Sequence, residues 1–407
     1  MVSRRTFLMG ATLLPLAARI TQASGANSVP DLGLNSLYAL QIGGVVPQSF
    51  KILSPNVLSL DKGTNSWASP PPMVEPVGAV VVDLRRGIDA LGLYNKIDNQ
   101  IIESHLTSIG ISALGGKLLS DYAVSGAFLP FSLSFLGLIS RKSVKLGVQT
   151  NFSSMQSMKV FISYLENILK RGFQPLAIGN KENLTGPLFF STLSLALNSS
   201  NFHTSLLSRK VSWKSQQMVK VFELLYNLKK FMNKSINEMS WTRAHKAVVD
   251  GDAIATFGAV DFAQKISLWD ANDLAIDALS FPNSSLQTRE VETTLQGFVF
   301  SKNLDSSIID SLITKAISLN LQRSFMNEYP HKLLLSTSGA RPWPGIAVEQ
   351  SRWKSRRFEP VTSLVMSLPP QFVSSTLAPA IQEVFEFRSP KQISNLCSKI
   401  QNDWQKL

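Results

Sequence analysis

The chain has 407 residues, of which 44% are hydrophobic, and its formal net charge is +12. A chain of this length is expected to form two lobes or domains, and its apolar content excludes a disordered protein. The single cysteine excludes an internal disulfide and a thiolate metal cluster, and the dispersed basic residues, without a recognition motif, argue against a nucleic-acid partner.

Residues 1–25 have the layout of an export signal. Arg4 and Arg5 precede an apolar run over residues 7–18, and small side chains follow at residues 23–26. The run is shorter than the roughly 20 residues that span a bilayer. The paired arginines and the Phe-Leu after them resemble a twin-arginine signal, which implies export by the twin-arginine translocase. No cysteine follows the signal, so we expect a cleaved, periplasmic protein without a lipid anchor.

The first half of the mature chain alternates between strand and helix patterns. Residues 78–83 form a β-branched run that is typical of a buried strand. Ser153 and Gln156 have the spacing of a capping box, and Gly172 is expected to end the helix that follows. The apolar face of that helix is predicted to contain Val160, Tyr164, Leu165, Ile168 and Leu169. Residues 175–179 then resemble a short strand.

The second half continues this alternation. A helix is predicted at residues 241–249 with Gly251 as its end, followed by a strand at residues 253–257 and another at residues 297–300. An amphipathic helix before these elements is marked by Met218, Val221, Phe222, Leu225 and Leu228. Alternating strands and helices predict an α/β fold with parallel strands.

The last helix has its own start signals. Ser389 is the expected cap, Pro390 the first helical residue, and Gln392 completes a capping box. Cys397 lies beside the predicted stripe and is expected to fill space without reacting. The stripe consists of Ile393, Leu396, Ile400 and Trp404.

Motifs for catalysis and cofactor binding are absent from the sequence. It has no glycine-rich nucleotide-binding loop, no zinc-protease motif and no G-x-S-x-G motif. The four histidines lack the spacing of metal ligands. Asp250 and Asp252 flank Gly251 and fit a turn as well as they fit acid–base chemistry. We therefore expect no catalytic residue, no cofactor and no bound metal.

Several segments resemble extracellular solute-binding protein family 1, the sugar-type receptors of ABC importers. LENILKRGFQPLAIG at residues 165–179 is similar to the helix-to-strand segment of that family. AHKAVVDGDAIATFGAVDFA at residues 244–263 and LQGFVFSKNLDS at residues 295–306 are similar to two later stretches. The tail at residues 370–407 fits the closing helices, and the order of these segments agrees over residues 75–407.

This resemblance implies a fold and a function. The fold is α/β with two periplasmic-binding-protein-like lobes (type 2), joined by hinge crossings and closing on a ligand. The implied lobes are residues 26–142 with 293–342, and residues 143–292 with 343–407. A monomer would deliver a carbohydrate or related polar solute to the permease subunits of an ABC importer. The expected ligand-binding residues are Trp67, Phe131, Asp261, Gln296, Gly297, Arg341 and Trp343.

Two positions depart from the family pattern. The PLA-G strand is usually followed closely by Trp, but residues 183–185 are Asn, Leu and Thr. No aromatic follows the AIATFG strand, where residues 259–261 are Ala, Val and Asp. Both changes weaken stacking on sugar rings, and Trp67, Phe131 and Trp343 are the aromatic residues expected to compensate.

Two other functions therefore stay open. One is a degenerate relative that has lost sugar binding and acts as an envelope interaction protein. The other is an exported enzyme. A receptor should have a cleft lined by aromatic and polar groups, a degenerate relative a filled or narrow one. An enzyme should pair an acid and a base with perturbed pKa values.

Overall fold

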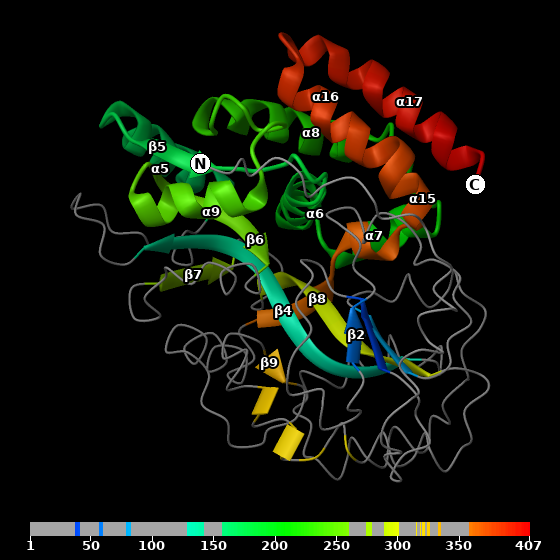
Figure 1. Ribbon diagram of the computed structural model, residues 1–407. Coiled ribbons are helices and arrows are strands. Elements are labelled where there is room, and N and C mark those ends of the chain that lie inside the picture. The colour runs from blue at the N-terminus through cyan, green and yellow to red at the C-terminus, as the bar shows by residue number, and fades with distance from the viewer. Residues whose placement is uncertain are drawn as a thin grey trace, which may run out of the picture.

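The computed structural model places a group of helices against a sheet with two long strands (Figure 1). No helix in the part of the chain that it describes is long and apolar enough to cross a membrane. All structural statements below concern the described residues, which are 37–40, 57–59, 79–82, 128–141, 157–259, 274–278, 289–300, 315, 318, 320–321, 324–325, 333–334 and 358–407.

The described strands join into one ten-stranded mixed sheet. Their bounds are β1 (Leu37–Leu40), β2 (Val57–Ser59), β3 (Ala79–Val82), β4 (Phe128–Arg141), β5 (Gln174–Ala177), β6 (Ala253–Ala259), β7 (Leu274–Ala278), β8 (Arg289–Phe300), β9 (Leu333–Leu334) and β10 (Phe358–Thr362). The main order is β2-β1-β3-β8-β4-β6-β5, while β7 and β9 pair with β4, and β10 pairs with β8. The predicted strands at residues 78–83, 175–179 and 253–257 are confirmed as β3, β5 and β6.

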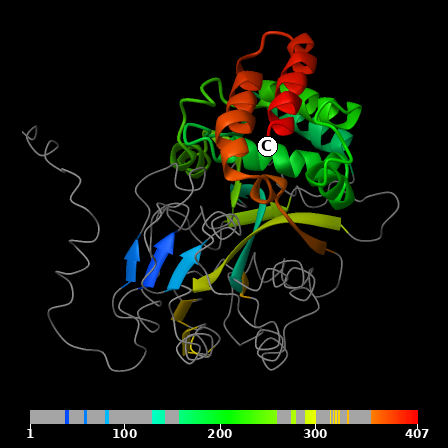
Figure 2. The same ribbon diagram turned by 90° about the vertical axis from the view of Figure 1, so that its right-hand side faces the viewer.

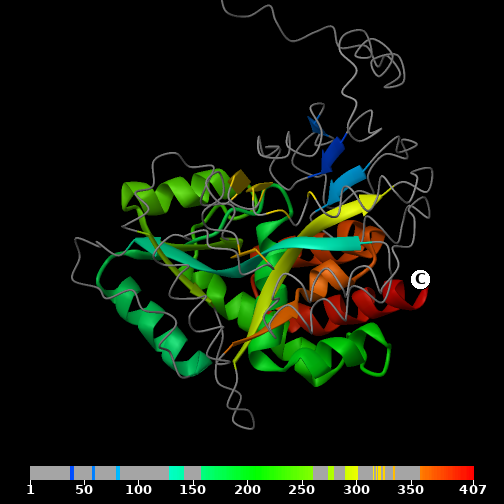
Figure 3. The same cartoon turned by 90° about the horizontal axis from the view of Figure 1, so that it is seen from below.

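Two long strands, β4 and β8, connect the two ends of this sheet (Figure 3). Residues 128–135 of β4 pair with β8, whereas residues 136–141 pair with β6 and β7. β8 begins beside β10 and ends beside β3. Each strand therefore belongs to two groups of elements, and any motion of one group relative to the other must bend β4 and β8.

The expectation of parallel strands is correct only for some of the strand pairs. β1, β2 and β3 are parallel to one another where they pair, and so are β5 with β6 and β8 with β10. β4 is antiparallel to β6, β7, β8 and β9, and β3 is antiparallel to β8. The antiparallel pairs arise because β4 and β8 cross between the two groups in opposite directions. The predicted strand at residues 297–300 is only the end of β8, whose polar first half hides the pattern.

Helix α5 (Met158–Lys170) begins later than the sequence predicts. Its cap is Ser157, whose hydroxyl accepts a hydrogen bond from the backbone N–H of Val160 at 3.3 Å. Ser153 and Gln156, which form the predicted capping box, lie outside the described residues, and α5 is capped by a serine closer to its apolar residues. Gly172 adopts a left-handed conformation just after the helix, with φ of 84°, which confirms its predicted role.

The buried face of α5 also differs in part from the prediction. Phe161, Leu165 and Ile168 are buried, which confirms the last two as core positions. Val160 and Leu169 are exposed, so the core-facing stripe is narrower and rotated relative to the predicted one. The surface position of α5, with one side facing solvent, explains the narrow stripe.

Helices α6 (Thr185–Leu197) and α7 (Ser200–Leu207) are not predicted from the sequence at all. Every residue of α6 from Thr185 to Leu195 is buried, because the helix lies between β6 and β8 on one side and other helices on the other. A helix that is apolar all round carries no amphipathic signal. The central helix of this region is therefore the one that a search for amphipathic patterns does not find.

Helices α8 (Gln216–Leu228) and α9 (Trp241–Asp250) match their predictions. All five predicted core residues of α8 are buried. α9 ends at Gly251, whose φ of 87° is a conformation that favours glycine. α8 and α9 are amphipathic surface helices, and such helices can be predicted from the spacing of their apolar residues.

The C-terminal segment folds back onto α6 and α8, as Figure 2 shows. It contains α14 (Leu364–Ser367), α15 (Pro370–Phe372), a π-helical turn (Val373–Leu377), α16 (Ala378–Glu386), a 3-10 turn (Pro390–Gln392) and α17 (Ile393–Gln405). Ser389 caps the 3-10 turn that precedes α17, and all four residues of the predicted stripe are buried. Cys397 is buried, and burial raises the pKa of its thiol to about 12, as expected of an inert residue.

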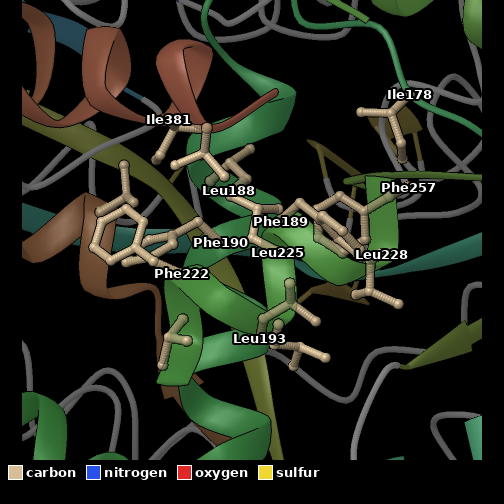
Figure 4. Packing of buried hydrophobic residues seen from close by; sticks show 14 of the residues in the cluster. Ile178, Leu188, Phe189, Phe190, Leu193, Phe222, Leu225, Leu228, Phe257 and Ile381 are labelled. Atoms are coloured by element: carbon tan, nitrogen blue, oxygen red, sulfur yellow. The ribbon is translucent and has the colours of Figure 1, made fainter. Parts of the chain in front are cut away.

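Aromatic rings pack among aliphatic side chains in the core of the helical region (Figure 4). Phe189 of α6 lies with its ring centre 4.8 Å from that of Phe257 on β6. On the outer side, Trp213 and Trp404 pack edge to face at 6.4 Å. Both tryptophans, and Trp241 on α9, are buried and act as packing residues.

Candidate functional site

Three of the predicted ligand-binding residues meet on the two crossing strands. Pro130 of β4 lies opposite Gly297 of β8, and Ser132 lies opposite Gln296. Phe131 is therefore an extra residue in β4, a β-bulge. Trp67, Asp261, Arg341 and Trp343 lie outside the described residues, and so their predicted roles stay predictions.

The bulge marks a place where the crossing strands bend. A bulge disrupts the ladder locally and increases the twist of the strand. Pro130 has no backbone N–H to donate to the ladder, and Gly297 opposite it has no side chain. The backbone therefore places Phe131, Gln296 and Gly297 together at a bend between the two groups of elements.

A second polar segment links the end of β5 to the start of α6. Asn180 accepts a hydrogen bond from the backbone N–H of Gly186 at 2.9 Å through its side-chain oxygen. Glu182 is buried and accepts from the backbone N–H of Trp241 at 3.2 Å. Asn183 adopts a left-handed conformation with φ of 53°. These contacts fix the segment between β5, α6 and α9, and residues 180–186 contain no aromatic side chain.

The most unusual site of the described chain surrounds Glu292 on β8. Its carboxylate accepts hydrogen bonds from the hydroxyls of Ser191 and Thr192 on α6. It also accepts one from the backbone N–H of Leu364, at the start of α14, at 3.1 Å. The Ser191 hydroxyl is 3.1 Å from that of Ser363, so four polar side chains form one buried cluster.

The Glu292 carboxyl group titrates far from its ordinary range. Burial raises its pKa to about 7, while the hydrogen bonds from Ser191, Thr192, Ser363 and Leu364 lower the pKa and oppose the effect. Burial disfavours the charged form and is the larger influence. The group therefore exchanges its proton near neutral pH while it stays almost completely out of contact with solvent.

Sequence analysis does not identify this cluster. Glu292 stands between Val291 and Thr293 in a strand, where a single glutamate carries no local signal. Ser191 and Thr192 lie 101 and 100 positions before Glu292 in the chain. Ser363 lies well after it, so only the fold brings these residues to Glu292. An alternation of glutamates at residues 290 and 292 within a β-branched strand is the one feature that could have drawn attention.

Two described histidines, His203 on α7 and His245 on α9, are buried. His203 Nε2 lies 3.0 Å from the Ser194 hydroxyl, and burial lowers the pKa of its ring to about 3. His245 Nδ1 lies 2.8 Å from the carbonyl oxygen of Trp241, and burial lowers its pKa to about 4. Both rings are neutral at ordinary pH and are parts of the core.

The Ser194–His203 contact does not have the arrangement of a nucleophile and its base. His203 Nδ1 has no hydrogen-bond partner in the described part of the chain, so no acid orients the ring. Both residues are buried inside the helical region and inaccessible to a substrate. Within the described ranges, moreover, no three His, Cys, Asp or Glu side chains come together as a metal site would require.

Comparisons with known proteins identify the fold. No protein-family model matches the sequence, and no curated protein sequence matches it significantly. Solved structures do match. The bacterial solute receptor AcbH, described as having an exclusive preference for β-D-galactopyranose, superposes with a TM-score of 0.74 at 16% identity, covering 91% of this chain and 98% of AcbH.

Two further structures agree with this match. A family 1 extracellular solute-binding protein from Bifidobacterium longum subsp. infantis has a TM-score of 0.63 at 15% identity, covering 91% of this chain and 98% of its own. A sugar transporter from Bacillus licheniformis in complex with stachyose has a TM-score of 0.65 at 12% identity, covering 90% and 98%. The chain has the two-lobed α/β fold of the solute-binding proteins. Each of β4 and β8 pairs with strands of both groups of elements described above.

Proposed function

We propose that this protein is an exported receptor that binds a carbohydrate or a related polar solute between its lobes and delivers it to an ABC importer. The observation that carries the proposal is the match over about nine-tenths of the chain to receptors whose described ligands are sugars. The receptor performs no chemistry. It works by binding its solute more tightly in one lobe arrangement than in the other, and the transporter reads that arrangement.

The proposed lobes follow the boundaries expected from the sequence. The first contains residues 26–142 and 293–342, and the second contains residues 143–292 and 343–407. Contacts of α16 and α17 with α8, and of α16 with α6, support the assignment of the C-terminal segment to the second lobe. The proposed export route is the twin-arginine translocase, with cleavage after residue 25 and release of a monomer into the periplasm.

The proposed binding site lies at the bend of the crossing strands. Phe131 is the bulge residue between the pairs Pro130–Gly297 and Ser132–Gln296, and its position beside Gln296 and Gly297 supports a common site between the lobes. An aromatic ring there would stack on a sugar face, and the amide would bind hydroxyl groups. The other proposed contacts are Trp67, Asp261, Arg341 and Trp343.

Thermal unfolding of the mature chain in the presence of candidate solutes tests the proposal. The panel should contain galactose, raffinose, stachyose, chitin oligosaccharides and a polyol, with an amino acid as the negative probe. A solute at about 100 times its dissociation constant should stabilise the folded protein by about 2.7 kcal/mol. Phe131→Ala should reduce the shift, whereas the matched control Val160→Ala, on the exposed face of α5, should preserve it.

A flat response to the whole panel would favour the second candidate, a relative that has lost sugar binding and acts as an envelope interaction protein. The observation that favours this candidate is the segment after β5. It has no aromatic residue between Asn180 and Gly186, and its polar side chains are used in contacts within the protein. The receptor should be stabilised by at least one solute of the panel and the degenerate relative by none, so the panel decides between them.

A further inference from the structure

Glu292 occupies a particular point in the connection between the lobes. It lies one residue before Thr293, where β8 pairs with Thr362 of β10 on one side and with Phe135 of β4 on the other. Beyond Thr293, β8 continues along β4 toward the first lobe. Glu292 is therefore at the end of β8 that is attached to the second lobe. This lobe contains α6 and α14 and is called the helical lobe below.

The carboxyl group of Glu292 attaches this strand to two other elements. Ser191 and Thr192 donate to it from the middle of α6, and the Leu364 N–H donates from the start of α14. All of these residues are almost completely buried. Removing an acceptor from such a site leaves several buried donors without a partner, which is costly. The strand end is thus fixed to the lobe through one side chain.

Among the described side chains of the elements packed against it, none brings a positive charge to this carboxyl group. α6 and α14 contain no ionisable residue, and His203 on α7 is neutral and contacts Ser194. On β8, Glu290 accepts from the backbone N–H of Ser200 at 2.9 Å, and Glu359 of β10 is its register partner. Arg141, the ionisable residue of β4, donates to the Val249 carbonyl at 2.8 Å.

We propose that Glu292 is a proton-linked anchor of the hinge: proton uptake by its carboxyl group fixes β8 to α6 and α14, and proton loss loosens this attachment. The anchor controls how firmly the crossing strand, and with it the first lobe, is held to the helical lobe. The inference needs the two-lobed fold. The anchor itself does not depend on the proposed solute-receptor function. Only its purpose rests on that function, and this purpose would be to make lobe closure depend on pH.

The direction follows from the cost of burying a charge. In the attached arrangement the pKa of Glu292 is about 7, because burial disfavours the ionised form. If the strand end moves and water reaches the carboxyl group, its pKa returns toward the ordinary 4.5. Between these two values the loosened arrangement releases a proton that the attached arrangement keeps. The loosened arrangement is therefore favoured increasingly as pH rises from about 4.5 to about 7, and little further above that.

Hydrogen–deuterium exchange of the protein without solute tests this anchor. The measured quantity is the protection of amides in residues 289–293 and 364–367, corrected for the intrinsic pH dependence of exchange. Protection in the wild type should fall between about pH 5 and about pH 7.5, by at most tenfold per pH unit, the limit for one proton. In Glu292→Gln, which keeps the shape but cannot ionise, protection should change by less than about twofold over the same range.

Two further variants keep the test decisive. Glu290→Gln removes a carboxylate two residues away on the same strand and should leave the pH dependence of the wild type in place. Thr192→Val removes one donor to the ionised carboxylate, so the loss of protection should extend to higher pH. If Glu292→Gln does not fold, Thr192→Val and Glu290→Gln still decide between an anchor and a passive contact.

Three results would overturn the anchor. They are constant protection in the wild type, an equal pH dependence in Glu292→Gln, and loss of the pH dependence in Glu290→Gln. None of these measurements uses a solute. If no sugar stabilises the protein but protection depends on pH, the proposed function is rejected and the anchor is retained. If a sugar stabilises the protein but protection does not depend on pH, the anchor is rejected and the proposed function is retained.

Discussion

Helices α6 and α17 are both thirteen residues long, yet they contribute to the fold in different ways. α17 lies on the outside of the helical lobe and buries one stripe of side chains against α8 and α16. α6 lies at the centre, and its residues from Thr185 to Leu195 are buried on every side. α6 also supplies Ser191 and Thr192 to the Glu292 cluster, so the same helix is both the core and the attachment point of a crossing strand.

The difference shows what a position at the centre of a lobe requires. A surface helix can contain both charged and apolar residues, because its charged side chains face solvent and stay hydrated. A central helix has to be apolar, and its few polar residues need partners inside the protein. Serine and threonine meet this requirement in α6 because each hydroxyl is small and can donate to a buried acceptor. Three variants break or sharpen this comparison.

The largest effect is expected in α6. Phe189→Ala removes a fully buried ring that contacts Phe257 on β6, and it leaves a cavity between the helix and the sheet. Such truncations cost roughly 3–5 kcal/mol. Urea unfolding followed by circular dichroism measures the loss in the free energy of unfolding. A loss below about 1 kcal/mol would mean that α6 is not the central helix of a packed lobe.

A smaller effect is expected in α17, and only on its buried stripe. Ile400→Ala should lower the free energy of unfolding by roughly 2–5 kcal/mol, because Ile400 is fully buried. Lys399→Ala at the neighbouring position is the matched control. Its side chain is exposed and pairs with Glu383 at 3.2 Å, so the change should be within about 0.5 kcal/mol. Equal losses from the two variants would contradict a one-sided α17.

The third prediction concerns the pH dependence of stability through Glu292. The pKa of Glu292 is about 7 in the folded protein and near 4.5 when the chain unfolds, so its contribution to stability is complete below pH 4.5 and is lost as pH rises through 7. The shift corresponds to at most roughly 3 kcal/mol. The difference between wild type and Glu292→Gln, measured by urea unfolding at several pH values, should change by up to this amount.

The difference between the two proteins is the informative quantity, because the buried histidines act in the opposite direction. Burial lowers the pKa of His203 to about 3 and that of His245 to about 4, so their contribution is present above pH 6.5 and is lost as pH falls. Both proteins contain these histidines. A difference that stays constant from about pH 4.5 to about pH 7 would show that Glu292 does not titrate as a buried group.

The sequence by itself determined several elements and their ends. The stripes of α8 and α17, the glycine ends of α5 and α9, and the strands β3, β5 and β6 are all visible in local patterns. Amphipathic spacing indicates which residues face the core and which face water, and glycine at a helix end indicates a left-handed backbone. The order of these segments was also sufficient to suggest the two-lobed fold that the solved structures then identified.

Only the tertiary structure decided the features that leave no distinct local pattern. The α6 helix, buried from Thr185 to Leu195, the antiparallel crossing of β4 and β8, and the start of α5 at Ser157 could not be read from the sequence. The Glu292 cluster joins residues from α6, β8 and α14 that are far apart in the chain. A buried carboxylate is tolerated through the donors that surround it, and which donors surround it is a property of the packed fold.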